Sequence, residues 1–286
     1  MADKGAVVIT GASTGIGEVC ALQLDKLGYR VFAGIRKAAD GESLRRRASA
    51  RLVPVRLDIS DETEIAHAAR NVKEALGGAG LAGLVNNAGI VVSGMLEFLP
   101  LHALRRQLEV NVIGQVAVTQ AFLPSLRQAQ GRIVNIGSLS GLISSPFTGA
   151  YCASKFALEA LTDALRQELR PWKMHVSIVE PGFIQTPILK KSLSEADAMR
   201  AELSTEALQL YGNSLRVVRD SIERESAQAA PPEVVAKAVV RALTARRPRT
   251  RYVVGAHSAL AISLRRALPG RWRDALIARH LGLDKG

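Results

Sequence analysis

The sequence has few cysteines and no long uncharged apolar run. Its two cysteines, Cys20 and Cys152, belong to no zinc-binding pattern. No apolar stretch approaches the roughly 18 to 20 residues that a membrane-spanning helix needs, and the first residues lack the apolar core of a signal peptide. Because disulfides are rare in reducing compartments, these absences predict a cytoplasmic protein with free thiols.

Histidine is also scarce and shows no spacing suited to metal ligands. We expect core or surface roles for all five histidines, and we predict that the protein holds no metal. They are His67, His102, His175, His257 and His280.

Acidic residues are sparse at one end of the chain. From Arg241 to Gly286 there are 11 Lys or Arg and 2 Asp, a net charge of +9, while the whole chain carries 38 − 26 = +12. The other 240 residues therefore carry only +3. A basic tail on a near-neutral body favours a surface or partner role for the tail. No recognised nucleic-acid-binding module accompanies the charge, so we predict no nucleic-acid partner.

Short β-branched runs alternate with longer segments of helical period. This alternation is typical of βαβ units and of a parallel sheet that is buried on both faces. It predicts an α/β fold, a doubly wound, seven-stranded parallel sheet of the Rossmann type. We expect strands near 5–10, 30–35, 52–56, 83–86, 131–136, 174–179 and 251–255, and helices near 15–27, 42–48, 61–76, 101–128, 150–170 and 232–245.

The segment from about 185 to 230 interrupts the alternation, because it has helical spacing and no strand run. Ligands in doubly wound sheets lie beyond the carboxyl ends of the strands. A helical insertion after the strand at 174–179 is therefore placed to roof a substrate cleft; a solvated helical pair without ligand contact is the alternative. We predict one domain, residues 1–256, followed by a basic C-terminal extension, residues 257–286.

The first predicted strand ends in a glycine-rich turn, TGASTGIG at 10–17, which opens a helix. Glycine lets the backbone approach a ligand, and the N–H groups and positive dipole end of a helix favour a pyrophosphate. A plain tight turn is the alternative. The predicted dinucleotide-binding residues of this turn are Gly11, Ser13, Thr14, Gly15, Ile16 and Gly17.

Tyr151 and Lys155 are four residues apart and so share one face of a predicted helix. A nearby ammonium favours the ionised form of a phenol, so we expect Lys155 to lower the pKa of Tyr151. The pattern predicts Tyr151 as a general acid/base for a carbonyl or alcohol oxygen. An ordinary exposed helix pair is the alternative reading of the same spacing.

Several motifs occur in an order that resembles the short-chain dehydrogenase/reductase family over the first 190 residues. They are TGASTGIG, Asp58 in RLDIS, Asn86–Gly89, Asn111 in EVNVIG, Ser138 in NIGSLSG, Tyr151–Lys155, and Pro181-Gly182 followed by Thr186. The resemblance implies a nicotinamide cofactor and hydride transfer to or from a carbonyl carbon. VFAGIR, GLVNNAGI, FLPSLR and AYCASKFALEAL resemble the hydroxysteroid and retinol dehydrogenase branches, which implies a large apolar alcohol or ketone of steroid, retinoid or lipid type.

The resemblance also implies roles for individual residues. Ser138 would hold the substrate oxygen, with Ser140 as a rival; Lys155 would hold the nicotinamide ribose and Asn111 a proton-relay water. Asp58 would bind the adenine amino group, unless it only caps a helix or a turn. The adenine-ribose side would be lined by Asn87, Ala88 and Gly89. The loop that contains Pro181, Gly182 and Thr186 would run past the nicotinamide carboxamide.

The end of the second predicted strand bears on cofactor choice. An acidic residue there would bind the ribose hydroxyls of NAD and repel a 2′-phosphate. This chain instead has Ile35, followed by Arg36 and Lys37. We therefore expect NADP(H) to be favoured over NAD(H). Ser13 and Thr14 in the glycine turn are uncharged, which predicts a moderate preference.

The resemblance further implies a homodimer or homotetramer, in which the helical segments 101–128 and 150–170 pair across a two-fold axis. The C-terminal extension mixes Trp272 and other apolar residues with arginines, and Pro269-Gly270 divides it into two helical pieces. These pieces suit peripheral membrane contact, closure of the substrate cleft, or packing on a partner subunit. The alternatives to an NADP(H)-dependent enzyme are an NAD-dependent enzyme of the same family and a non-catalytic dinucleotide-binding regulator.

Overall fold

A computed structural model describes residues 4–201, 203–255, 269–281 and 283 of the chain. Its strands form one seven-stranded parallel sheet in the order β3-β2-β1-β4-β5-β6-β7, which confirms the predicted doubly wound fold. The strands are β1 Ala6–Ile9, β2 Arg30–Ile35, β3 Leu52–Arg56, β4 Leu81–Asn86, β5 Arg132–Ile136, β6 His175–Pro181 and β7 Arg251–Val254.

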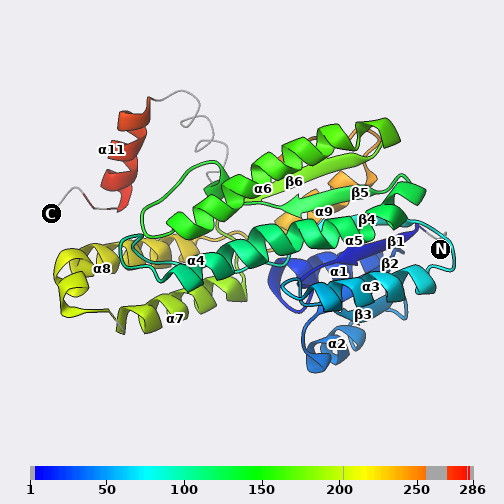
Figure 1. Ribbon diagram of the computed structural model, residues 1–286, viewed down its shortest axis with the longest axis horizontal. Coiled ribbons are helices and arrows are strands. Elements are labelled where there is room, and N and C mark those ends of the chain that lie inside the picture. Colours follow the sequence, from blue (N-terminus) through cyan, green and yellow to red (C-terminus); the bar gives the residue numbers. More distant parts are fainter. Residues whose placement is uncertain (1–3, 202, 256–268, 282, 284–286) are drawn as a thin grey trace.

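Helices such as α1 and α9 on one face and α3, α5 and α6 on the other cover this sheet (Figure 1). The helices of the described residues are α1 Gly15–Lys26, α2 Ala38–Arg45, α3 Glu62–Ala75, α4 Leu101–Leu108, α5 Gly114–Gln128, α6 Gly149–Glu168, α7 Pro187–Ala201, α8 Thr205–Ala227, α9 Glu233–Thr244 and α11 Gly270–Leu281. The first helical piece of the predicted C-terminal extension, before Pro269, lies outside the described residues.

Alternate residues of the central strand β1 enter opposite hydrophobic cores. Val7 and Ile9 of β1 belong to the core beneath α1 and α9, whereas Ala6 and Val8 belong to the core beneath α3 and α5. All four side chains are 3% exposed or less. A strand buried on both faces reads as a continuous apolar run, which is why these segments could be recognised in the sequence.

A chain of buried hydrogen bonds joins the two central strands to the helices above them. Asn86 Nδ2 at the end of β4 donates to Asn135 Oδ1 on β5 and to Thr119 Oγ1 on α5, both at 2.9 Å. Asn135 Nδ2 in turn donates to Thr162 Oγ1 on α6 at 2.8 Å. Buried polar groups are tolerated when they are paired in this way, and the pairing fixes the two strands that end at the site.

Two predicted helices differ from the observed ones. The segment 101–128 is interrupted by a π-helical turn at Glu109–Ile113, where the backbone of Gly114 lies so close to Ile59 that an added Cβ would be 2.2 Å from the Ile59 carbonyl oxygen. Such turns insert one extra residue and often occur at functional sites. The helix predicted at 42–48 runs instead from Ala38 to Arg45, with Asp40 in its first turn, where a negative charge suits the helix dipole.

The predicted insertion at 185–230 forms α7 and α8, which project beyond the carboxyl ends of the strands (Figure 1). Helix α11 of the C-terminal extension lies against α8. These three helices cover the sheet edge at which ligands of doubly wound folds bind.

Candidate active site

A large cavity opens at the carboxyl ends of the strands, with a volume of about 1760 Å³. It is lined by the glycine turn after β1, the ends of β2, β4, β5 and β6, and residues of α6, α7, α8 and α11. All the predicted site residues except Gly17 reach its wall, namely Gly11, Ser13, Thr14, Gly15, Ile16, Arg36, Lys37, Asp58, Asn87, Ala88, Gly89, Asn111, Ser138, Tyr151, Lys155, Pro181, Gly182 and Thr186.

The glycine turn needs its glycines for close packing. Gly11 and Gly15 have positive φ angles of 63° and 60°, which other residues rarely adopt. A Cβ on Gly17 would lie 2.3 Å from the Gly11 carbonyl oxygen and 2.4 Å from Asn87 Nδ2. Gly17 therefore supports the turn from behind and leaves the cavity wall to the other residues of the motif.

The segment after β4 braces the same turn. Asn87 Nδ2 donates to the carbonyl oxygens of Thr10 and Gly11 at 2.9 and 3.0 Å. Thr10 Oγ1 accepts hydrogen bonds from the backbone N–H groups of Asn87 and Ala88. Asn87 thus holds two of the turn's carbonyl groups and fixes the turn to the end of β4.

Helix α1 begins at Gly15 beside the cavity. Within the described chain, its N-cap residue Thr14 makes no side-chain capping hydrogen bond to the first turn. The first N–H groups of a helix have no partner inside the helix, and with the helix dipole they favour an anion. The tight turn and this helix end fit the pyrophosphate of a dinucleotide.

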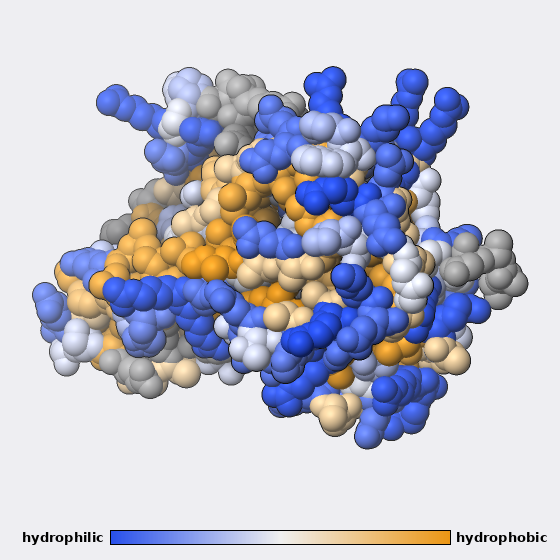
Figure 2. Space-filling model, turned by 45° about the vertical axis from the view of Figure 1, so that its right-hand side comes forward, coloured by the Kyte–Doolittle hydropathy of each residue, from blue (hydrophilic) through white to orange (hydrophobic). Residues whose placement is uncertain are grey.

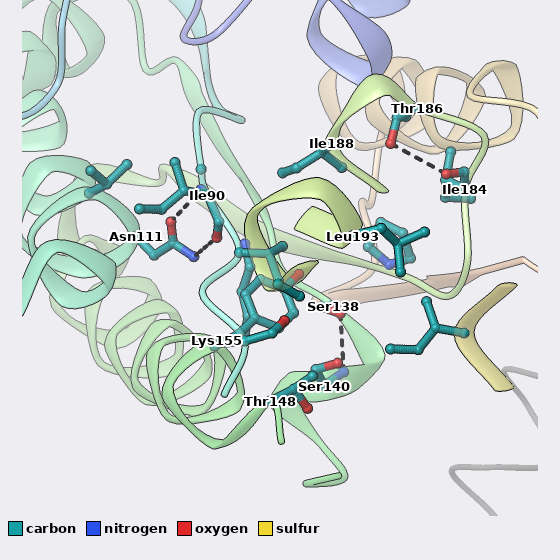
Figure 3. Close-up of a pocket in the computed structure, with 18 of the residues that line it drawn as sticks. Ile90, Asn111, Ser138, Ser140, Thr148, Lys155, Ile184, Thr186, Ile188 and Leu193 are labelled. Carbon is teal, nitrogen blue, oxygen red and sulfur yellow. Dashed lines mark hydrogen bonds between the residues drawn. The ribbon is translucent and has the colours of Figure 1, made fainter. Parts of the chain in front are cut away.

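Ser138, Tyr151 and Lys155 converge on the opposite wall, at the end of β5 and the start of α6. The Ser138 side chain hydrogen-bonds that of Tyr151, and its Oγ also accepts from the Ser140 backbone N–H at 3.1 Å. Ser138 and Lys155 face the same space in Figure 3. Lys155 is 5% exposed, and its Nζ donates to the Ile136 carbonyl oxygen at 2.7 Å. Ser138, rather than Ser140, is the serine that contacts the phenol.

The expected lowering of the Tyr151 pKa by Lys155 is wrong. Burial raises the pKa of Tyr151 to about 12, although the hydrogen bond with Ser138 lowers it. The reason is geometric, because the Lys155 ammonium binds the Ile136 carbonyl and lies 5.8 Å from the centre of the phenol ring. In this state Tyr151 is a protonated phenol at neutral pH.

Burial acts in the opposite sense on Lys155. Removal of the ammonium from water lowers the pKa of Lys155 to about 8, while the charge of Glu159 raises it. The ammonium form therefore predominates at neutral pH and is lost as the pH rises through about 8. The site thus contains a proton-holding phenol and a cation that titrates close to physiological pH.

Asn111 lies in the π-helical turn, and its side chain is turned toward Ile90 (Figure 3). Its Nδ2 donates to the Ile90 carbonyl oxygen at 3.0 Å and its Oδ1 accepts from the Ile90 N–H at 2.8 Å. Nδ2 also donates to Ser154 Oγ at 3.2 Å. The amide therefore fixes the loop after β4 against α6, a contact that the sequence motif did not reveal.

The far end of the cavity carries charges. Arg36 Nη1 lies 3.9 Å from Asp58 Oδ2. Burial opposes ionisation of Asp58, but two hydrogen bonds from Ser60 and the charge of Arg36 outweigh it and lower the pKa of Asp58. Asp61, rather than Asp58, caps α3 by accepting from the N–H groups of Thr63 and Glu64. Asp58 therefore does not cap the helix, but its Oδ1 accepts from the Ser60 N–H at 3.0 Å, so the turn role that was part of its alternative is present.

Apolar side chains gather around a hollow on one face of the molecule (Figure 2). Motif-based reasoning missed the residues that roof the cavity, because they lie in α8, α11 and two loops that carry no motif. The sequence does contain a signal for part of this roof, namely an apolar stripe at helical spacing in α8. The roof includes Met95, Phe98, Phe147, Leu215, Val218, Ile222, Leu276, Ile277 and Leu281.

Tyr211 joins α8 to the two loops below it. Its ring meets Phe98 and Phe147 edge-on, with centroids 5.9 and 6.2 Å away, and its hydroxyl donates to Glu97 Oε2 at 2.6 Å. Aromatic pairs in this geometry attract each other beyond simple burial. The contact holds α8 over the cavity.

In the described parts of the chain, no group of three or more His, Cys, Asp or Glu side chains is arranged to hold a metal ion. Within the same residues, none of the helices combines the length and the apolar character needed to cross a bilayer.

Comparison with known proteins gives consistent matches. A family model described as short chain dehydrogenase matches residues 5–197. Retinol dehydrogenase 5 of Mus musculus is 40% identical over 277 residues, 95% of this chain and 87% of that protein. The 17-beta-hydroxysteroid dehydrogenase type 6 of Homo sapiens is 38% identical over 254 residues, 87% of this chain and 80% of that protein.

Solved structures match along almost the whole chain. A short chain dehydrogenase from Burkholderia cenocepacia in complex with NADP has a TM-score of 0.72 at 26% identity, covering 98% of each chain. A short chain dehydrogenase/reductase from Burkholderia phymatum in complex with NAD has a TM-score of 0.76 at 27% identity, covering 92% of each chain.

We predict that Gly17→Ala destabilises the glycine turn. The new methyl group has no space beside Gly11 and Asn87, and overpacking of this kind costs about 1 to 3 kcal/mol. Denaturant unfolding measures the loss. Gly212→Ala is the matched control, because nothing lies within 4 Å of its added Cβ on α8, and it should stabilise the protein by about 0.5 to 1 kcal/mol. Equal stabilities of the two variants would contradict the packing argument.

Proposed function

This chain belongs to the short-chain dehydrogenase family and is an oxidoreductase acting on CH–OH groups, and we propose that it interconverts a large apolar alcohol and its ketone or aldehyde with NADP(H). The resemblance to retinol and hydroxysteroid dehydrogenases is confirmed by these relatives. The observation that carries the proposal is the convergence of Ser138, Tyr151 and Lys155 on one cavity wall, opposite the glycine turn.

In the proposed reaction, the bound nicotinamide supplies or accepts the hydride. Ser138 Oγ holds the substrate oxygen beside the Tyr151 hydroxyl, to which it is already hydrogen-bonded. Tyr151 gives a proton to that oxygen during reduction and takes one during oxidation. Because its pKa is raised by burial, the phenol begins as a proton donor. Lys155 supplies the positive charge that stabilises the phenolate left after the proton has moved.

The cofactor residues are proposed on the same cavity. The glycine turn and the N-terminus of α1 would hold the pyrophosphate, and Asp58, Asn87, Ala88 and Gly89 the adenosine half. Pro181, Gly182 and Thr186 would border the nicotinamide, and Asn111 would act by fixing the loop at Ile90. Arg36 and Lys37 support a preference for NADP(H), because both are exposed on the cavity wall where a 2′-phosphate would lie.

The substrate proposal follows from the apolar roof over Ser138 and Tyr151. Helix α11 contributes Leu276 and Ile277 to this wall, which favours cleft closure among the roles considered for the C-terminal extension. We treat residues 1–256 as the catalytic domain and 257–286 as its extension. A non-catalytic dinucleotide-binding regulator is the second candidate; the presence of both Tyr151 and Lys155 disfavours it, and a turnover assay separates the two.

The same proposal places the enzyme in the cytoplasm as a homodimer or homotetramer. Leu101 and Ile113, at the two ends of α4 and its π-helical continuation, are 63% and 51% exposed, and such apolar surface suits a subunit interface. Light scattering at micromolar concentration should therefore give at least the mass of a dimer. A monomer mass would contradict this part of the proposal.

Contact with a membrane surface is proposed for the outer side of α11. Trp272 is 68% exposed there, next to the exposed Arg271, and aromatic and basic residues together suit an anionic lipid interface. Trp272→Ala should weaken the affinity for anionic vesicles, measured by co-sedimentation, roughly ten- to a hundredfold. This ratio corresponds to the free energy of burying a large apolar side chain. Trp172→Ala is the control, because the Trp172 ring stacks with Arg127. Failure of the full-length protein to bind vesicles at low salt would contradict the contact.

We predict that Tyr151→Phe lowers turnover by at least ~10²-fold, the usual scale for losing an acid/base group, and leaves NADPH binding nearly intact. A screen of steroids, retinoids and simple ketones with NADPH and NADH identifies the substrate for the assay. Tyr29→Phe is the control, because Tyr29 lies in the hydrophobic core beneath α1. Near-normal turnover of the Tyr151 variant would remove the phenol from its role.

We predict that Arg36→Asp shifts cofactor preference toward NADH, because a carboxylate would replace the partner of the 2′-phosphate. A charge-assisted hydrogen bond is worth about 1.5 to 3 kcal/mol, or roughly ten- to a hundredfold in NADPH affinity. Titrations with both cofactors measure the change. Arg45→Asp, an equal charge change on α2, should leave the ratio unchanged. Tighter binding of NADH than of NADPH by the wild type would overturn the assignment.

A further inference from the structure

Helix α6 carries a third ionisable residue on the face that holds Tyr151 and Lys155. Glu159 follows Lys155 by four residues, so it lies one helical turn further along. It is 7% exposed. A Cβ on Gly137 would lie 3.2 Å from Glu159 Oε1, so this carboxyl packs beneath the segment between Ile136, which binds the Lys155 ammonium, and Ser138.

Glu159 meets a second buried acid at the end of the neighbouring strand. Glu180 on β6 is 0% exposed, and its carboxyl is in hydrogen-bonding contact with that of Glu159. Arg251 on β7 faces both, with its Nη2 2.9 Å from Glu159 Oε2 and its Nε 3.2 Å from Glu180 Oε1. The same guanidinium donates to both carboxylate oxygens of Asp163, at 3.0 and 2.9 Å.

The two buried carboxyls share one guanidinium. Arg251 pairs with Glu159, Glu180 and Asp163, while the Lys155 ammonium near Glu159 donates its hydrogen bond to the Ile136 carbonyl. In the described chain, Glu159 Oε1 and both Glu180 oxygens are buried and receive no hydrogen bond from any N–H or hydroxyl donor. One proton between the two carboxyls would supply the missing donor and relieve the repulsion between their charges, as in other close carboxyl pairs.

We propose that Glu159 and Glu180 share one proton and together act as positioning residues for Lys155. Through Glu159, the pair provides the counter-charge that keeps the buried ammonium protonated and directed at the Ile136 carbonyl. The catalytic consequence rests on the proposed function, whereas the shared proton does not.

Deprotonation of the Glu159–Glu180 pair would stabilise the Lys155 ammonium in the pH range where that ammonium begins to lose its own proton. Burial raises the pKa of both carboxyls, that of Glu180 to about 7, with the charge of Glu159 acting in the same direction and that of Arg251 opposing it. Loss of the shared proton near neutral pH adds a negative charge behind Lys155 just below the pH at which its own proton would leave. The other charged groups that act on the pair are Lys155, Asp163 and Arg251.

Unfolding measured against pH tests the shared proton without any assay of activity. An unfolded glutamate titrates near 4.3, whereas burial raises the pKa of Glu180 to about 7, so between about pH 5 and pH 7 the folded protein holds the extra proton and loses stability as the pH rises. Glu180→Gln keeps a hydrogen-bond donor and removes the titration. Its melting temperature relative to wild type should therefore rise from pH 5 to about pH 7 and then level off toward pH 8. A constant difference over this range would overturn the shared proton.

Asp163→Asn is the matched control, because it removes a carboxylate from the same guanidinium. Hydrogen bonds from Arg251 and Arg166 lower the pKa of Asp163, so this residue stays ionised throughout the range and its variant should differ from wild type by a constant amount. If Glu180→Gln does not fold, infrared titration of the wild type gives the same answer. A protonated carboxyl band that disappears near neutral pH is expected, and its absence at pH 6 would overturn the proposal.

The positioning role is tested by the pH profile of turnover. Glu159→Gln removes the counter-charge of the Lys155 ammonium. The fall in turnover at high pH should therefore begin about one pH unit lower than in wild type. Above that pH the variant should turn over roughly tenfold more slowly than wild type. An unchanged profile in an active enzyme would overturn the positioning role. A protein that shows the infrared and stability signatures but no hydride transfer would overturn the proposed function and leave the shared proton in place.

Discussion

The Lys155 ammonium is a charge held almost entirely out of water, and the geometry of the site depends on how it is held. Its hydrogen bond to the Ile136 carbonyl ties α6 to the end of β5. Ser138 follows Ile136 by two residues and Tyr151 precedes Lys155 by one helical turn, so the same tie sets the serine and the phenol against each other. A buried charge is tolerated only when its surroundings compensate it. In the proposed arrangement, the buried acids Glu159 and Glu180 compensate the charge of Lys155.

A second set of contacts fixes the other wall of the cavity. Asn87 and Thr10 lock the glycine turn to the end of β4, and Asn86 continues the connection to β5 and α5. The two walls therefore belong to one hydrogen-bonded framework at the carboxyl edge of the sheet. Such preorganisation favours binding and orientation of ligands without a large rearrangement of the backbone.

Much of this arrangement could be predicted from the sequence, because its cause is local. The β2 and β3 ranges agree with the structure residue by residue. The run RVFAGI buries both faces of β2, whereas β3 lies at the edge of the sheet, is only partly buried and is recognised by its β-branched residues. The glycine turn and the Tyr151–Lys155 spacing are equally local patterns. The cluster of Glu159, Glu180 and Arg251 could not be found in this way, because its members come from α6, β6 and β7 and meet only through the sheet register. The direction of the Tyr151 pKa was missed for a similar reason, since spacing does not reveal where the ammonium points.

The central claim is that the wall formed by Ser138, Tyr151 and Lys155 transfers hydride between a nicotinamide and a carbonyl carbon. Isotope transfer tests it most directly, with NADPH deuterated at either of the two C4 positions, a ketone from the substrate screen, and mass spectrometry of the alcohol. The account predicts one deuterium on the carbinol carbon from one of the two labelled cofactors and none from the other. Alcohol without deuterium from either cofactor, or no alcohol with any ketone of the screen, would contradict it.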